Sequence, residues 1–155
     1  LLAYARDAVL RLCTPFILKK NYDERIPRVE LEKYIESKRP ERYSPATLKS
    51  ISQNVNSSFT KSGHLFGRTK KIRKRPEVTP AVYSFAILIG YLKGLRGEDL
   101  VTSEFVKILE LSKAESISLA IIASGQGLLV VRTVGEVIDI SFPKEIELLI
   151  KKADL

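Results

Sequence analysis

Hydrophobic side chains recur every third or fourth position between residues 44 and 63, and this period predicts an amphipathic helix. Ser44 can cap the free backbone N–H groups at the start, and the proline that follows is tolerated at the first helical position. Gly63 can supply the left-handed residue that ends a helix. The buried face is expected to consist of Leu48, Ile51, Val55 and Phe59.

Two further helices are predicted on the N-terminal side of this one. The first covers residues 2–18, and because a proline inside a helix kinks or ends it, Pro15 predicts a bend or break near Thr14. Residues 21–27 are expected to form a polar connection. The second helix covers residues 29–37, and its inward side chains are expected to be Val29, Leu31, Tyr34 and Ile35.

Residues 64–75 predict a β-hairpin directly after the helix that begins at Ser44. A short strand, a turn at Gly67 and a second strand follow one another. A short helix, a turn and a polar-faced helix make a helix-turn-helix, and the hairpin would make it winged. No Asp or Glu occurs from residue 44 to residue 75, whereas seven cations follow residue 60: Lys61, Arg68, Lys70, Lys71, Arg73, Lys74 and Arg75.

The order of three helices and a hairpin recurs in the second half of the chain. Helices are expected at residues 81–92, after a Thr102 cap, after a Ser112 cap with Glu115 completing a capping box, and at residues 145–152. Glu98 and Asp99 are expected in a loop, and a hairpin at residues 128–142 is expected to turn at Gly135-Glu136. The predicted fold class is mainly α with short β-hairpins, an α+β arrangement of two winged-helix-like units packed together, residues 1–77 and residues 78–155.

The charge of the chain is divided unevenly between these two units. Residues 1–77 contain 18 Lys and Arg against 8 Asp and Glu, a net charge of +10, whereas residues 78–155 contain 8 against 10, a net charge of −2. A basic half joined to a slightly acidic half indicates a different partner for each. We interpret the second unit as a scaffold or as a contact for a protein partner or for a second copy of the chain. A self-contained core explains its aliphatic residues equally well.

The helix that begins at Ser44 and its hairpin have the chemistry of a DNA-reading element. Short polar side chains suit base edges in the major groove, and the cations beside them suit phosphates. The base readers are expected to be Ser50, Gln53, Asn54 and Asn56, with phosphates held by Lys49, Lys61 and the hairpin. His64 is expected to pack or to touch a phosphate. The predicted site for double-stranded DNA is Thr47, Lys49, Ser50, Gln53, Asn54, Asn56, Ser57, Lys61, His64, Arg68, Lys70, Lys71, Arg73, Lys74 and Arg75; a solvated helix followed by a basic loop is the alternative.

Residues suited to catalysis or to metal binding are scarce. One Cys and one His do not make a structural zinc site, and the chain has no phosphate-binding Gly-Lys-Ser/Thr motif. Glu98 and Asp99 are adjacent, but a nuclease needs further acids to hold a divalent ion. The sequence therefore indicates a protein that is not an enzyme and that needs no metal or other cofactor.

The single Cys13 excludes a disulfide framework and fits the reducing cytoplasm. The apolar stretch at residues 81–92 is too short to span a bilayer, so no membrane partner is expected. Because the sequence contains no Met, we expect the natural N-terminus to be missing.

Four groups of residues in the first half carry a resemblance to known proteins. They are Tyr4-Ala5-Arg6-Asp7, Leu31 with Tyr34, Ser44-x-x-Thr47-Leu48 and Ser62-Gly63-His64-Leu65. The order of elements resembles a tandem of the winged helix-turn-helix superfamily over most of the chain, and residues 2–63 resemble the small DNA-binding A protein of BREX phage-defence systems. That resemblance implies a cytoplasmic, non-catalytic DNA-binding role in defence against phage. The long cation run and the second winged-looking unit depart from this family.

Two other functions fit parts of the same pattern. A protein-interaction subunit of a larger nucleoprotein complex would use the basic hairpin to contact an acidic partner. An RNA-binding accessory would use it on RNA, for example on a double strand. Binding to duplex DNA in the presence of an RNA competitor separates these hypotheses from DNA binding.

Overall fold

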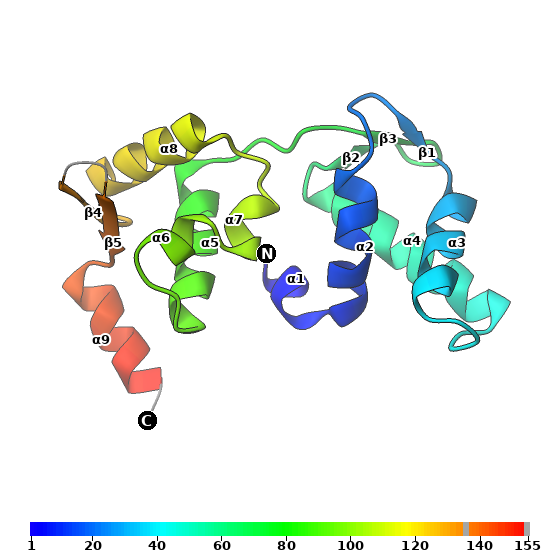
Figure 1. The fold of residues 1–155 in the computed structure, drawn as a ribbon, viewed down its shortest axis with the longest axis horizontal. Helices are drawn as coiled ribbons and strands as arrows, with labels where there is room; N and C mark the ends of the chain where they lie inside the picture. Colours follow the sequence, from blue (N-terminus) through cyan, green and yellow to red (C-terminus); the bar gives the residue numbers. More distant parts are fainter. Residues whose placement is uncertain (135–136, 154–155) are drawn as a thin grey trace. The chain divides into compact units, whose positions relative to one another are not determined.

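The computed structural model describes residues 1–134 and 137–153, which form mainly helices with two small antiparallel sheets (Figure 1). The chain divides into two compact units, Leu2–Glu77 and Val78–Leu155, which we call the first and second units and describe separately. The turn predicted at Gly135-Glu136 lies outside the described residues. Among the helices described, none combines the length and the hydropathy that a membrane span requires.

The first unit combines helices with a small three-stranded sheet (Figure 1). Its strands lie in the order β1-β3-β2, and neighbouring strands are antiparallel. The elements in chain order are α1 (Leu2–Arg6), α2 (Ala8–Leu18), β1 (Arg25–Ile26), α3 (Arg28–Lys38), α4 (Pro45–Lys61), β2 (Leu65–Phe66) and β3 (Lys71–Arg73).

The first predicted helix is interrupted at Asp7, and α2 continues without a break through Thr14, where a bend or break was predicted. The Asp7 carboxylate caps α2 because it accepts hydrogen bonds of 2.8 and 3.0 Å from two backbone N–H groups of the next turn. Arg11 closes the other side of the break, since its guanidinium donates at 2.6 Å to the carbonyl of Ala5 in α1. Pro15 lies inside α2 with its ring exposed. A side-chain cap, and not the proline, therefore sets this boundary.

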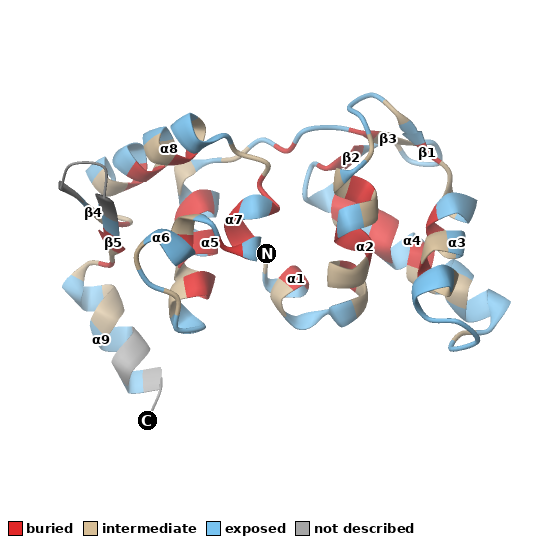
Figure 2. Cartoon of the chain, viewed as in Figure 1, coloured by how far each residue is buried: buried red, intermediate tan, exposed pale blue. Residues whose placement is uncertain are grey.

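Helix α4 begins and packs as predicted. The Ser44 hydroxyl accepts a hydrogen bond of 3.3 Å from the Thr47 N–H, and Gly63 follows the helix with a φ of 81°. Helix α4 packs against α3 and α2, and its buried residues lie along this contact (Figure 2). The predicted inward face is buried at Val55 and Phe59 and half-buried at Leu48 and Ile51.

Helix α3 was predicted with one wrong inward residue. Leu31 and Ile35 are fully buried, one helical turn apart, as expected. Val29 is exposed, because a residue two positions before Leu31 points to nearly the opposite side of the helix. The inward stripe of α3 is therefore narrower than the sequence pattern suggested.

The strand β1 lies where a polar connection was predicted at residues 21–27. Arg25 pairs with Ile72 of β3, and Ile26 pairs with Lys71. Ile26 is buried, and this burial explains why one hydrophobic residue stands among polar ones. At the hairpin turn Gly67 has a φ of 99°, and a Cβ there would lie 2.2 Å from the Lys70 carbonyl oxygen, so the turn requires glycine.

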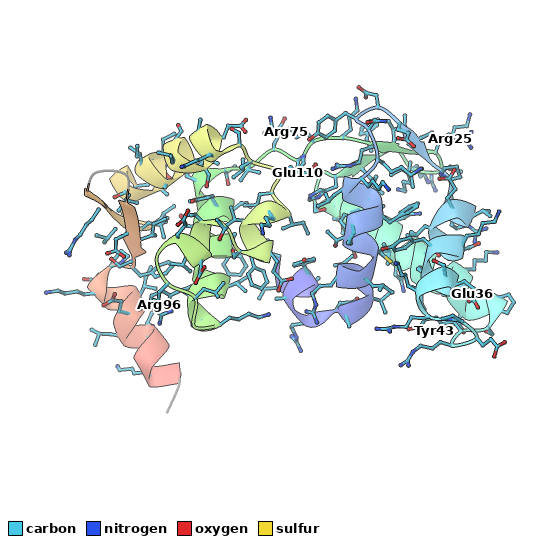
Figure 3. The ribbon with its side chains drawn as sticks, in the orientation of Figure 1. Arg25, Glu36, Tyr43, Arg75, Arg96 and Glu110 are labelled. Carbon is cyan, nitrogen blue, oxygen red and sulfur yellow. The ribbon has the colours of Figure 1, made fainter. Side chains whose placement is uncertain are left out.

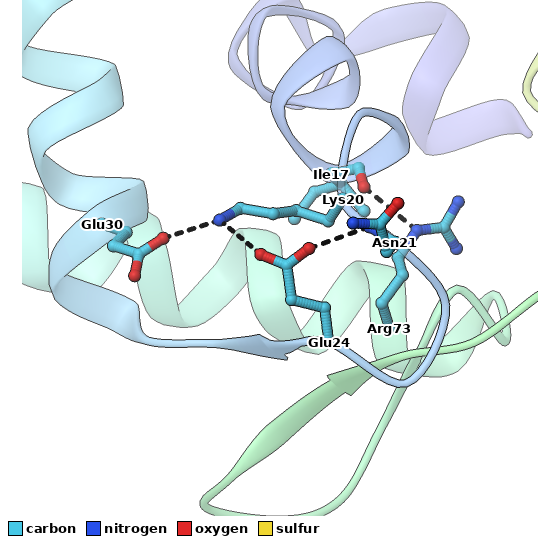
Figure 4. A network of polar contacts seen from close by, with 6 residues as sticks. All are labelled: Ile17, Lys20, Asn21, Glu24, Glu30 and Arg73. Atoms are coloured by element: carbon cyan, nitrogen blue, oxygen red, sulfur yellow. Dashed lines mark hydrogen bonds and ion pairs between the residues drawn. The ribbon is translucent and has the colours of Figure 1, made fainter.

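Arg73 is the largest fully buried side chain of the first unit and ties the sheet to α2 (Figure 4). Its Nε donates at 3.0 Å to the carbonyl of Ile17 in the last turn of α2. Its Nη1 donates to the carbonyls of His64 (3.2 Å) and Lys74. Its backbone N–H donates at 2.9 Å to the carbonyl of Glu24, just before β1. Carbonyl oxygens therefore take the place of water around this charge.

Lys20 forms an ion-pair network beside that contact (Figure 4). Its Nζ lies 2.9 Å from Glu24 and 2.8 Å from Glu30, so it joins the loop after α2 to the start of α3. The hydrogen bond from Lys20, followed by one from the Asn21 N–H, holds the pKa of the Glu24 carboxyl below its ordinary value. Hydrogen bonds to Glu30 and Glu24 raise the pKa of Lys20. The network fixes the segment that leads into β1.

The second unit contains α5 (Pro80–Leu92), α6 (Glu98–Val101), α7 (Glu104–Lys107), α8 (Lys113–Gly125), β4 (Val130–Val134), β5 (Val137–Ser141) and α9 (Lys144–Ala153). The two strands pair antiparallel, and this confirms the predicted hairpin. The predicted capping box at the start of α8 is also confirmed: Ser112 accepts from the Glu115 N–H at 3.2 Å, and the Glu115 carboxylate accepts from the Ser112 N–H at 2.8 Å. Helix α5 packs against α7 and α8 and buries Tyr83 and Ile87 completely.

Two boundaries of the second unit differ from the prediction. Glu98 and Asp99 lie in the first turn of α6 instead of a loop, where a carboxylate stabilises the positive end of a helix. Thr102 ends α6 and donates at 3.1 Å to the Glu98 carbonyl, so it does not cap the next helix. That helix, α7, begins after Ser103.

Replacing Arg73 by Met should destabilise the first unit, because buried carbonyls would lose a charged donor. We expect the free energy of unfolding to fall by about 2–4 kcal/mol in urea denaturation. Lys74→Met likewise removes a cation at the next residue, whose exposed side chain pairs with the exposed Asp23. This control should cost about 1 kcal/mol or less. Equal losses from the two variants would contradict a structural role for Arg73.

Candidate nucleic-acid interface

Helix α4 presents a polar face to solvent, on the side opposite its contact with α2 and α3. The face carries hydroxyls, amides and two ammonium groups, and it contains no carboxylate. Seven residues of the predicted DNA-binding set are exposed there: Thr47, Lys49, Ser50, Gln53, Asn54, Ser57 and Lys61.

A polar depression of about 680 Å³ lies between α4 and the β2–β3 hairpin. The hairpin turn contributes Arg68 and Thr69, while β1 and the start of α3 contribute Ile26 and Arg28. Four cations line it, and Asp and Glu are missing from its lining. The full lining is Ile26, Arg28, Gln53, Asn56, Ser57, Thr60, Lys61, Arg68, Thr69 and Lys71. The lining therefore carries a net positive charge, which the ion pair of Arg28 with Glu32 reduces.

Asn56 was predicted to be an exposed base reader, but it lies buried in the lining of the depression. It follows Val55 on the buried side of α4, and this position limits its exposed fraction to 5%. Its Oδ1 has no hydrogen-bond partner among the described residues. Buried amide groups are nearly always hydrogen-bonded, so this unpaired oxygen is available to a donor group of a ligand.

Two hairpin cations are held by the protein itself. Lys71 is half-buried and donates to the Thr60 hydroxyl at 2.9 Å and to the Gly67 carbonyl at 2.6 Å. Lys74 forms an ion pair with Asp23, a residue remote from it in the sequence. Residues 44–75 contain no acid of their own, but the fold places the Asp23 carboxylate beside Lys74. This ion pair reduces the positive charge that the hairpin offers to a ligand.

Arg73 and His64 belong to the predicted DNA-binding set, but both side chains are buried. The Arg73 guanidinium is directed at backbone carbonyls inside the first unit, as described above. The His64 ring packs edge-on against Phe59 with 5.5 Å between ring centroids, and its Nδ1 lies 2.8 Å from the Ser62 hydroxyl. His64 therefore closes the core beneath the hairpin, as the packing alternative held.

Three predicted phosphate contacts, Arg68, Lys70 and Arg75, are exposed. Figure 3 shows Arg75 on the segment that leaves β3 and Arg25 at the other end of the sheet. In the same view Glu36 and Tyr43 lie at the end of the first unit away from the sheet. Exposed cations therefore extend along the sheet side of the unit.

Two residues of this surface were missed in the sequence. Arg28 lines the depression and forms an ion pair of 2.9 Å with Glu32. The available signal was Pro27, because proline often stands at a helix start and would have placed Arg28 in the first turn. Phe66 is 66% exposed on β2, beside the cations, where an aromatic ring can contact bases or sugars. Strand β2 is only two residues long, so it shows no alternation of polar and apolar residues from which the outward direction of Phe66 could be predicted.

The described part of the chain offers little support for metal binding or for nucleophilic catalysis. No group of three or more His, Cys, Asp and Glu side chains is placed there to hold a metal ion. Burial, with a smaller effect of the Asp7 charge, raises the pKa of the Cys13 thiol to about 12. This thiol stays protonated at neutral pH and is unsuited to act as a nucleophile. The residues brought together on the first unit offer non-covalent binding of an anion.

The chain matches no protein-family model, no curated protein and no solved structure.

Proposed function

We propose that the first unit is a winged helix-turn-helix domain that binds double-stranded DNA. In this proposal α4 enters the major groove and the β2–β3 hairpin is the wing. The chain order of helices and strands and the antiparallel sheet β1-β3-β2 support this assignment. The second unit, with its helices and its β4–β5 hairpin, is proposed as a second winged-helix-like unit.

One observation carries the proposal: the acid-free, cation-lined depression between α4 and the hairpin. A nucleic-acid backbone is a regular row of negative charges, and cations that neutralise it gain affinity by releasing counterions. The depression adjoins the polar face of α4, so a phosphate held beside Lys61 and Arg68 would bring base edges toward Gln53. A solvated helix with an unrelated basic loop would not need these groups to meet in one concave surface.

The exposed residues divide into two proposed roles. Ser50, Gln53 and Asn54 have short polar side chains that can donate and accept at base edges. The buried Asn56 is proposed to accept, through its unpaired Oδ1, a hydrogen bond from a donor group of the nucleic acid such as a base amino group. The phosphate contacts are proposed to be Arg28, Lys49, Lys61, Arg68, Lys70 and Arg75. The resemblance of residues 2–63 to the BREX A protein supports a cytoplasmic, non-catalytic role in phage defence or in regulation.

Affinity for duplex DNA should fall steeply with salt. Five to seven phosphate contacts release that many counterions, so log K against log salt is expected to have a slope of about −4 to −6. Fluorescence anisotropy of a labelled duplex titrated with the full chain measures it. A slope near zero would contradict DNA binding. Stronger displacement by double-stranded RNA than by DNA would favour the RNA-binding alternative.

Phosphate contacts and base contacts should respond differently to substitution. Lys61→Glu is expected to weaken binding to every duplex alike, whereas Lys33→Glu, at an exposed lysine of α3 outside the depression, should have a smaller effect. Gln53→Ala or Asn54→Ala should cost about 1–3 kcal/mol at a preferred site and little at other sites. Equal losses from Lys61→Glu and Lys33→Glu would show that net charge, and not this surface, drives binding.

The second unit is proposed to contact a protein partner or a second copy of the chain. The observation in favour is a pair of exposed isoleucines on α8, Ile121 (59% exposed) and Ile122 (46% exposed). If the partner is a second copy, sedimentation of the full chain should depend on concentration, and Ile121→Ser with Ile122→Ser should abolish that dependence. A monomer at all concentrations would leave a different protein as the partner.

A further inference from the structure

The second unit contains a pocket of about 290 Å³ that plays no part in the proposed DNA binding. Helices α5, α6, α7 and α8 and strand β5 all contribute to its lining. Most of the wall is apolar and includes Val101, Val106, Ile117, Ala120 and Ile140. An engineered protein cavity of about 150 Å³ is large enough to bind benzene. This pocket therefore has room for an apolar group about twice that size.

A buried pair of hydroxyl groups also lines the pocket. Tyr83 is fully buried, and its phenolic oxygen accepts a hydrogen bond of 3.0 Å from the Ser116 hydroxyl. This bond closes the polar end of the pocket floor, because both hydroxyl groups are buried. Burial raises the pKa of Tyr83, so its phenol stays neutral in the pocket floor.

The charged residues of the lining give the pocket a net positive charge. Lys107 and Lys113 both line it, and neither forms an ion pair with a described residue. Lys113 is the first residue of α8, and the Glu115 carboxylate already caps that helix start. Glu98 is the one carboxylate among the lining residues. The two unpaired ammonium groups thus outweigh the one carboxylate of the lining.

We propose that this pocket binds a small amphiphilic carboxylate. The hydrocarbon part of the ligand fills the apolar wall, where removal from water provides most of the affinity. The carboxylate lies toward Lys107 and Lys113. A neutral ligand would leave both lysines without a counter-charge, and an amphiphilic amine would meet them with like charge.

Three probes of equal chain length test the charge preference on the full chain: octanoate, 1-octanol and octylamine. Saturable binding is followed by isothermal titration and by backbone amide shifts in NMR spectra. We expect octanoate to bind at least about tenfold more tightly than octylamine, with 1-octanol between them. Octylamine binding as tightly as octanoate, or no saturable binding of octanoate, would overturn the proposal.

Variants of the lining locate the binding site. Ala120→Leu should abolish octanoate binding because the added carbons occupy the pocket. Lys113→Ala should weaken it about two- to fivefold, as expected for a partly exposed charge pair, and Glu98→Gln should strengthen it. Lys33→Ala, in the first unit, is the matched control and should change nothing. Because Lys113 and Glu98 are exposed, their variants test the pocket even if Ala120→Leu impairs folding. Unchanged octanoate affinity in both of them would overturn the proposal.

Discussion

The first unit depends on the hydrogen bonds of one buried guanidinium. Arg73 joins the last turn of α2 to the hairpin, because Ile17 and His64 both offer it a carbonyl oxygen. A buried cation is tolerated only when its donors are satisfied, and the C-terminal end of a helix adds a partial negative charge. The side chain therefore fixes where the hairpin lies relative to α2. Since α2 and α3 also pack against α4, the same contact relates the hairpin to the polar helix.

The depression between α4 and the hairpin follows from this arrangement. Strand β1 pairs with β3 and brings Arg28 to the lining, while the turn at Gly67 leads directly to Arg68. The protein uses part of the basic run for its own structure: Arg73 is buried, and Lys71 is bonded to Thr60. The exposed charge of the hairpin is therefore smaller than its sequence suggests, and it is concentrated beside α4.

Much of the fold could be predicted because its causes are local. The caps at Ser44 and Ser112 act within one helical turn, so a few residues determine where α4 and α8 begin. The break at Asp7 was also local, but the sequence offered a proline as a competing signal, and the aspartate cap decided the boundary. The sequence pattern therefore predicted where the helices lie, except where two local features indicated different boundaries.

The missed features depend on residues that are distant along the chain. Strand β1 is two residues long, too short for an alternating pattern, and it exists because β3 pairs with it. Arg73 carries the same side chain as the exposed Arg75, and only the carbonyls of α2 and the hairpin distinguish their roles. Asn56 lies at the border between the exposed and buried faces of α4, and the packing of the helices determines that its side chain is buried.

The burial of Cys13 makes it a natural reporter of the first unit. It is the chain's one cysteine, it is completely buried, and its raised pKa keeps the thiol protonated. A thiol reagent can modify it only when α2 separates from its neighbours, so the labelling rate measures the opening of this unit. The second unit contains no thiol, so its motions do not contribute to that signal. A single reagent can thus follow one half of the protein in the presence of the other.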